Sequence, residues 1–141
     1  QKKGIIHREY QAVVEGVMAD DQGCIDLPIA RKDPELRERM VDDEGKAALT
    51  NYQVLKRFSG HTLVSLLLGS GRTHQIRVHL SYIGHPICGD ELYGSPSPLI
   101  DRQALHAGKL NFIQPRTGHT LQFEVPLPDD MQHLLSYISG T

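Results

Sequence analysis

The apolar residues of this chain are clustered in short runs separated by polar and turn residues, and the pattern predicts mainly strands. Five segments combine β-branched or aromatic residues with flanking turn residues: 8–16, 48–58, 61–68, 105–113 and 120–125. Ser59 and Gly60 separate the second segment from the third, which predicts a hairpin. A turn through Pro115 and Gly118 joins the last two segments.

One segment between these strands has helical spacing instead. Residues 73–83 place Ile76, Leu80 and Ile83 at i, i+4 and i+7, so that one face of the predicted helix is apolar. Thr73 is the predicted N-cap, and the glycine that follows Ile83 is the predicted stop. A second amphipathic helix is predicted over 128–138, at the end of the chain.

The remaining segments predict connections. Residues 24–30 form a short extended piece that Pro28 keeps away from a central strand position, and residues 31–46 form a polar, highly charged surface excursion. Residues 94–103 contain glycine and prolines and predict a loop. The order of elements predicts an α+β fold, with a mainly antiparallel sheet flanked by helices.

Composition limits the classes of protein that fit. The 141 residues make one domain or a large piece of one, and no apolar run reaches the ~20 residues of a membrane helix. No signal peptide is visible. Cys24 and Cys88 are far apart and form no Cys-x-x-Cys pair, which argues against a disulfide framework or a zinc knuckle. We therefore expect a cytoplasmic protein that does not bind a membrane.

The net charge of −2 counts against a partner held by overall electrostatics, but positive residues gather locally. Arg72, His74, Arg77 and His79 fall within eight residues, with Gln75 among them, at the start of the predicted helix. Backbone N–H groups at a helix start favour anions, and arginine grips a carboxylate or phosphate with two hydrogen bonds. The segment could therefore hold a phosphate or a buried carboxylate, or it could be a solvated face.

A metal site is the other chemistry that this region could serve. The histidines and the cysteine that could act as ligands are His74, His79, His85, Cys88 and His106. The first two are five residues apart, unlike the i, i+4 pair of zinc hydrolases, and no acidic residue stands at the expected spacing. Metal binding is therefore not expected.

One run of the sequence is distinctive. It extends from Gly69 to Gly94 and contains Gly71-Arg-Thr-His-Gln-Ile-Arg-Val-His79, followed by Gly84-His-Pro-Ile-Cys-Gly-Asp-Glu-Leu-Tyr-Gly94. This run resembles the third motif of the RluA-type family of ribosomal and transfer RNA pseudouridine synthases. Further segments resemble that family in the same order: Tyr10-Gln-Ala-Val-Val-Glu-Gly16, Ile25-Asp-Leu-Pro-Ile29, Gly45-Lys-Ala-Ala-Leu-Thr50 and Leu105-His-Ala107.

The resemblance implies an activity and a partner. Such enzymes convert uridine in ribosomal or transfer RNA to pseudouridine by breaking the N1–C1′ bond and rejoining the base through C5. They use an aspartate nucleophile and need neither a cofactor nor a metal. Because the target must leave its stack to be reached, base flipping and aromatic support are expected.

Two residues receive catalytic roles from the resemblance. Tyr10 matches the active-site tyrosine that packs against the uracil, and Arg77 matches the arginine that pairs with the catalytic aspartate. We expect both side chains to line one pocket for a flipped-out uridine. Without the family pattern, Tyr10 is an ordinary strand aromatic and Arg77 an exposed helix arginine.

Four neighbouring residues are predicted to bind substrate or support the site. Arg72, His74 and Gln75 are expected to contact RNA phosphate or the loop that bears the aspartate, with support of the loop as the preferred interpretation. Ile76 is either an apolar wall of the pocket or part of the core.

The nucleophile itself is not matched. In the family it lies in a His-Arg-Leu-Asp-x-x-Thr-Ser-Gly motif before the tyrosine strand, and no such string occurs in this sequence. Asp26 and Asp90 lack that context, and Asp90 is expected to form local hydrogen bonds in a turn. We therefore expect residues 1–141 to be the C-terminal portion of a catalytic domain. A non-catalytic RNA-binding module and an unrelated phosphate-binding or metal-dependent hydrolase domain are the alternatives.

Overall fold

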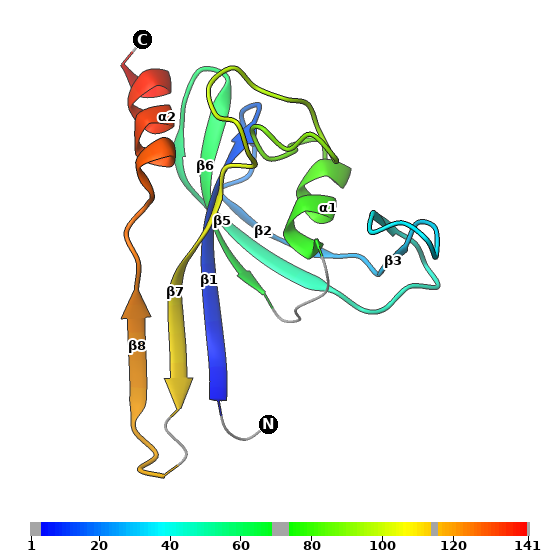
Figure 1. The fold of residues 1–141 in the computed structure, drawn as a ribbon, viewed down its shortest axis with the longest axis vertical. Helices are drawn as coiled ribbons and strands as arrows, with labels where there is room; N and C mark the ends of the chain where they lie inside the picture. The colour runs from blue at the N-terminus through cyan, green and yellow to red at the C-terminus, as the bar shows by residue number, and fades with distance from the viewer. Residues whose placement is uncertain (1–3, 69–73, 114–115, 141) are drawn as a thin grey trace.

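A single six-stranded antiparallel sheet forms the body of the protein (Figure 1). The structure is a computed structural model that describes residues 4–68, 74–113 and 116–140. In the order β2-β5-β6-β1-β7-β8, the sheet contains β2 (Gln22–Asp26), β5 (Leu49–Arg57), β6 (His61–Leu68), β1 (Gly4–Glu15), β7 (Leu105–Ile113) and β8 (Thr120–Glu124). All five predicted strands are confirmed, and so is the α+β class.

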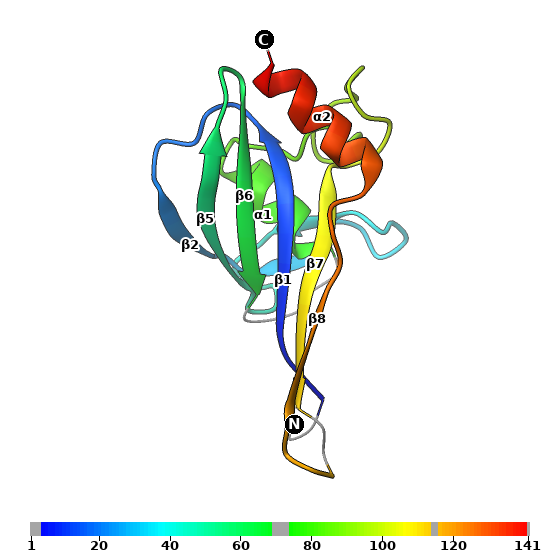
Figure 2. The ribbon, with the colours of Figure 1, turned by 90° about the vertical axis from the view of Figure 1, so that its left-hand side faces the viewer.

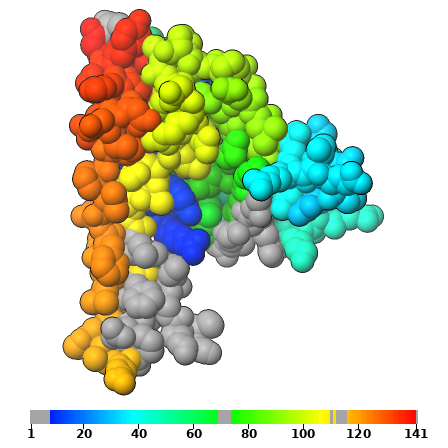
Figure 3. All heavy atoms as spheres, in the orientation of Figure 1, coloured from blue at the N-terminus to red at the C-terminus, as the bar shows by residue number. Residues whose placement is uncertain are grey.

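The prediction for residues 24–46 was incomplete, because this segment contains a second sheet of two strands. There β3 (Ile29–Arg31) pairs with β4 (Arg39–Val41), where we expected only an extended piece and an irregular excursion. The anchor of this hairpin is small: Ile29 and Ala48 are buried against Val78 of the first helix. Because each strand is only three residues long and lies within a mostly charged segment, the sequence shows no apolar alternation there. The hairpin projects from the body on one side (Figure 3).

Two helices lie on opposite sides of the main sheet, α1 (Gln75–Tyr82) and α2 (Asp129–Ser139) (Figure 2). The closing helix is confirmed to within one residue at each end. The first helix is shorter than predicted and begins after His74, whose φ of 57° is left-handed and whose side chain makes no capping hydrogen bond. The predicted cap, Thr73, lies outside the described residues. Gly84, with φ of 91°, follows the helix end as expected.

The strand register decides which residues share the α1 side of the sheet. Tyr52, Leu66 and Tyr10 are direct neighbours across β5, β6 and β1, so their side chains lie on one face. Thr50, two residues before Tyr52, is hydrogen bonded to His79 of α1, which places the helix over that same face. The hydrophobic core extends between this face of the sheet and α1. No helix in the described ranges is long and apolar enough to cross a membrane.

Candidate functional site

An arginine–aspartate pair forms the most constrained polar contact beside α1. Arg77 Nε donates to Asp90 Oδ2, and Arg77 Nη2 donates to Asp90 Oδ1, both at 2.9 Å. The side chain of Asp90 is completely buried and that of Arg77 is 16% exposed. The backbone N–H groups of Leu92 and Tyr93 also donate to Asp90 Oδ1. Burial alone would raise the pKa of Asp90, but the hydrogen bonds from Arg77 and from the turn hold this pKa below its ordinary value.

These contacts answer one expectation and correct another. The local hydrogen bonds predicted for Asp90 are confirmed. Arg77 is not the exposed helix arginine of the simpler interpretation, because its guanidinium holds a buried carboxylate. In the described residues that carboxylate belongs to Asp90. The pairing of Arg77 with a catalytic aspartate remains a prediction.

Tyr93 connects the arginine to the β3–β4 hairpin. Its hydroxyl accepts a 2.8 Å hydrogen bond from the backbone N–H of Arg39 and lies 2.7 Å from His74 Nδ1. The guanidinium of Arg77 lies 5.1 Å from the centre of the Tyr93 ring, within cation–π range. Ser81 Oγ donates to the Tyr93 carbonyl oxygen at 2.6 Å, which fixes the residue against α1.

The two described histidines of the predicted basic cluster both have a lowered pKa, which favours their neutral form. Burial, and secondly the charge of Arg77, lower the pKa of His74. Burial also lowers the pKa of His79, although the hydrogen bond to the Leu27 carbonyl partly opposes this. Among the described residues Arg77 is paired with Asp90, so the local positive charge expected from the sequence stays a prediction. Sequence spacing could not reveal the pairing or the burial, because both come from tertiary packing.

Gln75 and His79 form a buried network under the helix. Gln75 is 2% exposed, and its Nε2 donates to the Leu49 carbonyl at 2.8 Å and to Thr50 Oγ1 at 2.9 Å. His79 Nε2 donates to the Leu27 carbonyl at 2.9 Å, so its Nδ1 accepts from the Thr50 hydroxyl at 2.8 Å. Gln75 therefore supports the helix start from inside. Arg72 lies outside the described residues.

Tyr10 lies at the rim of an open hollow on the α1 side of the sheet edge. The hollow has a volume of about 400 Å³, and its lining includes Arg8, Ala107, Phe123 and Val125. Phe123 and Val125 are 52% and 55% exposed, so they present apolar surface to solvent. Tyr10 is half-buried and packs against the core cluster that contains Ile76. Ile76 itself is 5% exposed, which makes it a core residue.

The relation between Tyr10 and Arg77 can be described from the register and the helix. Both residues belong to the α1 side of the sheet, as a shared site requires. The guanidinium, however, is directed to Asp90 and Tyr93, whereas the hollow beside Tyr10 is formed by β1, β7 and β8. One pocket lined by both side chains therefore stays a prediction.

Sequence reasoning missed the role of Tyr93 and the Arg77–Asp90 pair. Both partners belong to the Gly89-Asp-Glu-Leu-Tyr-Gly94 run, 13 and 16 residues after Arg77. The closeness of this run to Arg77 in the sequence was a hint that the two could interact. The sequence alone, however, does not tell which side chains are in contact.

The histidines weighed as metal ligands have other partners. His85 Nδ1 lies 2.9 Å from the Glu15 carbonyl oxygen, and His106 Nε2 lies 2.8 Å from that of Val125. The ring nitrogens of His79 are both used, as described above. Among the described residues these histidines do not converge on one point.

Comparison with known proteins gives consistent matches. Residues 1–82 match the sequence profile of the family described as RNA pseudouridylate synthase. The chain is 48% identical over 135 residues to an uncharacterised RNA pseudouridine synthase of Bacillus subtilis, covering 96% of this chain and 48% of the relative. It is 47% identical over 143 residues to ribosomal large subunit pseudouridine synthase D of Nitrosomonas europaea, covering 94% and 41%.

A solved structure shares the fold. Human RNA pseudouridylate synthase domain containing 1 superposes with a TM-score of 0.74 at 29% identity, covering 85% of this chain and 54% of that one. The chain spans about half the length of the curated relatives it matches.

Proposed function

Because this chain belongs to the RNA pseudouridylate synthase family, we propose that it is the substrate-orienting, C-terminal portion of an enzyme that isomerises uridine to pseudouridine in RNA. The observation that supports this most directly is the buried Arg77–Asp90 pair beside a sheet face that bears Tyr10. A side chain fixed by two parallel hydrogen bonds is suited to holding reacting groups in place.

Tyr10 and its hollow would receive the base. Isomerisation breaks the N1–C1′ bond and makes a bond to C5, so the uracil has to leave its stack and be held in a pocket. A tyrosine ring beside exposed apolar side chains offers a stacking surface for a planar base. The half-buried position of Tyr10 suits this role because the ring is both supported and accessible.

Arg77 would organise a carboxylate supplied by another part of the enzyme. Asp90 uses two of the five N–H donors of a guanidinium, and the other three can serve another oxygen. The nucleophilic aspartate implied by the family would be this second partner. Asp90 would then act as a positioning residue that fixes the plane of the guanidinium.

We propose ribosomal large subunit RNA, in the cytoplasm, as the substrate in preference to transfer RNA. The support is that several relatives at 42–47% identity are named ribosomal large subunit pseudouridine synthase D. RNA shape and loop structure set specificity in RNA recognition, so the choice of uridine would depend on surfaces beyond the site itself.

The test uses the full-length protein with unmodified large-subunit ribosomal RNA and transfer RNA, and pseudouridine is mapped by carbodiimide labelling and primer extension. We expect modification of the ribosomal RNA, and a loss of about 100-fold or more in the Arg77→Lys variant, since lysine cannot reproduce the two-pronged geometry. The matched control is Tyr82→Phe on the same helix, 62% exposed, with unchanged activity. RNA binding without any pseudouridine in either RNA would instead identify a non-catalytic RNA-binding module.

A further inference from the structure

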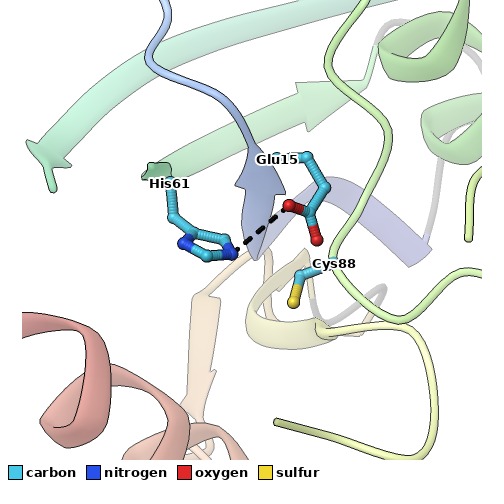
Figure 4. Close-up of side chains that lie close together, drawn as sticks. All are labelled: Glu15, His61 and Cys88. Atoms are coloured by element: carbon cyan, nitrogen blue, oxygen red, sulfur yellow. Dashed lines mark ion pairs between the residues drawn. The ribbon is translucent and has the colours of Figure 1, made fainter. Parts of the chain in front are cut away.

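Three side chains with different donor atoms converge where β1 ends and β6 begins. Glu15 is the last residue of β1, His61 the first of β6, and Cys88 lies in the segment between α1 and β7. One ligand atom from each lies within 4.8 Å of the others, and His61 Nε2 is 3.4 Å from Glu15 Oε1 (Figure 4). Of the residues that the structure describes, this is the group of histidine, cysteine and carboxylate side chains compact enough to hold a metal ion.

The backbone fixes all three positions. Glu15 and His61 are direct partners in the β1–β6 register. The N–H of Cys88 donates to the Val13 carbonyl at 2.8 Å, and its own carbonyl accepts from Ala104 at 2.9 Å. The three side chains are therefore brought together by sheet pairing, independently of any ion.

We propose that Glu15, His61 and Cys88 bind a zinc ion, with water as the fourth ligand. Tetrahedral zinc with bonds of about 2.0–2.3 Å has ligand atoms about 3.3–3.6 Å apart. The 3.4 Å between His61 and Glu15 already equals one edge of that tetrahedron, and the spread of at most 4.8 Å requires only a small contraction. A thiolate, an imidazole and a carboxylate together suit zinc better than magnesium or calcium, which prefer oxygen ligands.

The charges balance when zinc binds. Without metal, burial raises the pKa of the Cys88 thiol to about 11, so the sulfur is protonated. Zinc displaces this proton to solvent, and the resulting thiolate and the Glu15 carboxylate neutralise the two positive charges of the ion. The side chains of Glu15 and His61 are 44% and 18% exposed, so water and metal reach the site although Cys88 is buried.

Zinc bound at this site would also affect the neighbouring turn that bears Asp90. Cys88 is two residues before Asp90, and Gly89 between them has φ of 82°, with Arg102 O only 2.3 Å from where a Cβ would lie. Zinc would therefore hold this tight turn against the sheet. Its effect on Arg77, and so on activity, rests on the proposed function, whereas binding of the metal does not.

Cobalt(II), a spectroscopic substitute for zinc, tests the site in the reduced, chelator-treated full-length protein. We expect a thiolate-to-cobalt charge-transfer band in the near ultraviolet, intense tetrahedral bands in the visible, and loss of both when one equivalent of zinc is added. Cys88→Ala should abolish the charge-transfer band, while the matched control Cys24→Ala, which removes the exposed cysteine, should retain it.

Glu15→Gln is the second variant, because a partly exposed side chain can be changed without unfolding the protein. We expect it to weaken zinc binding by more than about tenfold, since even residues behind the ligands commonly contribute that much. Zinc should also raise the melting temperature of the wild type and leave that of Cys88→Ala unchanged. A cobalt spectrum without the charge-transfer band, or a band unaffected by Cys88→Ala, would overturn the proposal and identify an ordinary ion pair beside a packed thiol.

Discussion

Arg77 and Asp90, 13 residues apart in the chain, face each other with two parallel hydrogen bonds of 2.9 Å. A second pair of the same geometry, Arg102 with Asp130, lies near the surface at 2.8 and 3.0 Å. The acidic side chain is fully buried in the first pair and 40% exposed in the second. The two pairs share their chemistry and differ in burial, which makes them a natural comparison.

Asp90→Asn should therefore destabilise the fold far more than Asp130→Asn. The first substitution leaves the charge of Arg77 largely buried without its partner, which costs about 3–5 kcal/mol. The second removes a solvated pair, for which we expect about 1 kcal/mol or less. Urea denaturation of both variants measures the difference. Equal losses would show that burial of the Arg77–Asp90 pair has no energetic consequence.

Tyr93→Phe removes one hydroxyl and keeps the ring. The hydroxyl contacts the Arg39 backbone N–H and His74 Nδ1, so its loss leaves a part-buried donor and acceptor without their partner. We expect a loss of about 1–3 kcal/mol in the free energy of unfolding. Tyr82→Phe, at a residue 62% exposed, is the control and should be close to neutral. A Tyr93→Phe variant as stable as wild type would mean that the hydroxyl does not anchor β4.

Stability should also fall as the solution becomes acidic, because His79 is buried in its neutral form. Its folded pKa is lowered, so the unfolded state binds protons more readily. This contribution is fully present above the unfolded-state pKa of about 6.5 and is lost as pH falls from there toward the folded pKa.

The measurement for His79 is the free energy of unfolding from about pH 7.5 to about pH 5.5. His79→Gln should be less stable at the higher pH and show a shallower dependence. His133→Gln, at an exposed position on α2, should keep the slope of the wild type. An unchanged slope in His79→Gln would assign the pH dependence to other groups.

The sheet could be predicted from the sequence because its strands gather β-branched and aromatic residues between turn residues. In β6, Thr62, Val64 and Leu66 are buried while their neighbours are only partly so, as expected for a strand with one face toward the core. The start of α1 could not be predicted in the same way. His74 is left-handed and Gln75 is buried, and the latter is fixed by Leu49 and Thr50, which are remote in sequence.

The candidate site, too, could be predicted only in part from the sequence. The resemblance to the family's motifs identified Tyr10 and Arg77 as the residues to examine, and an arginine near a helix start suits an anion. The sequence did not reveal that Asp90 is that anion, or that Tyr93 lies against the guanidinium. Both facts depend on how the turn after α1 folds back on the helix, and no local pattern determines that.

The last prediction concerns the 141 residues by themselves. The family uses an aspartate nucleophile, and the acidic residue held by Arg77 is Asp90, whose carboxylate is completely buried and already accepts from Arg77 and two backbone N–H groups. A carboxylate in that state is not free to attack a nucleotide. We therefore expect the isolated chain, folded as judged by circular dichroism, to form no pseudouridine in a uridine-containing RNA. Turnover above that of an Arg77→Lys control would show that a nucleophile lies within these residues.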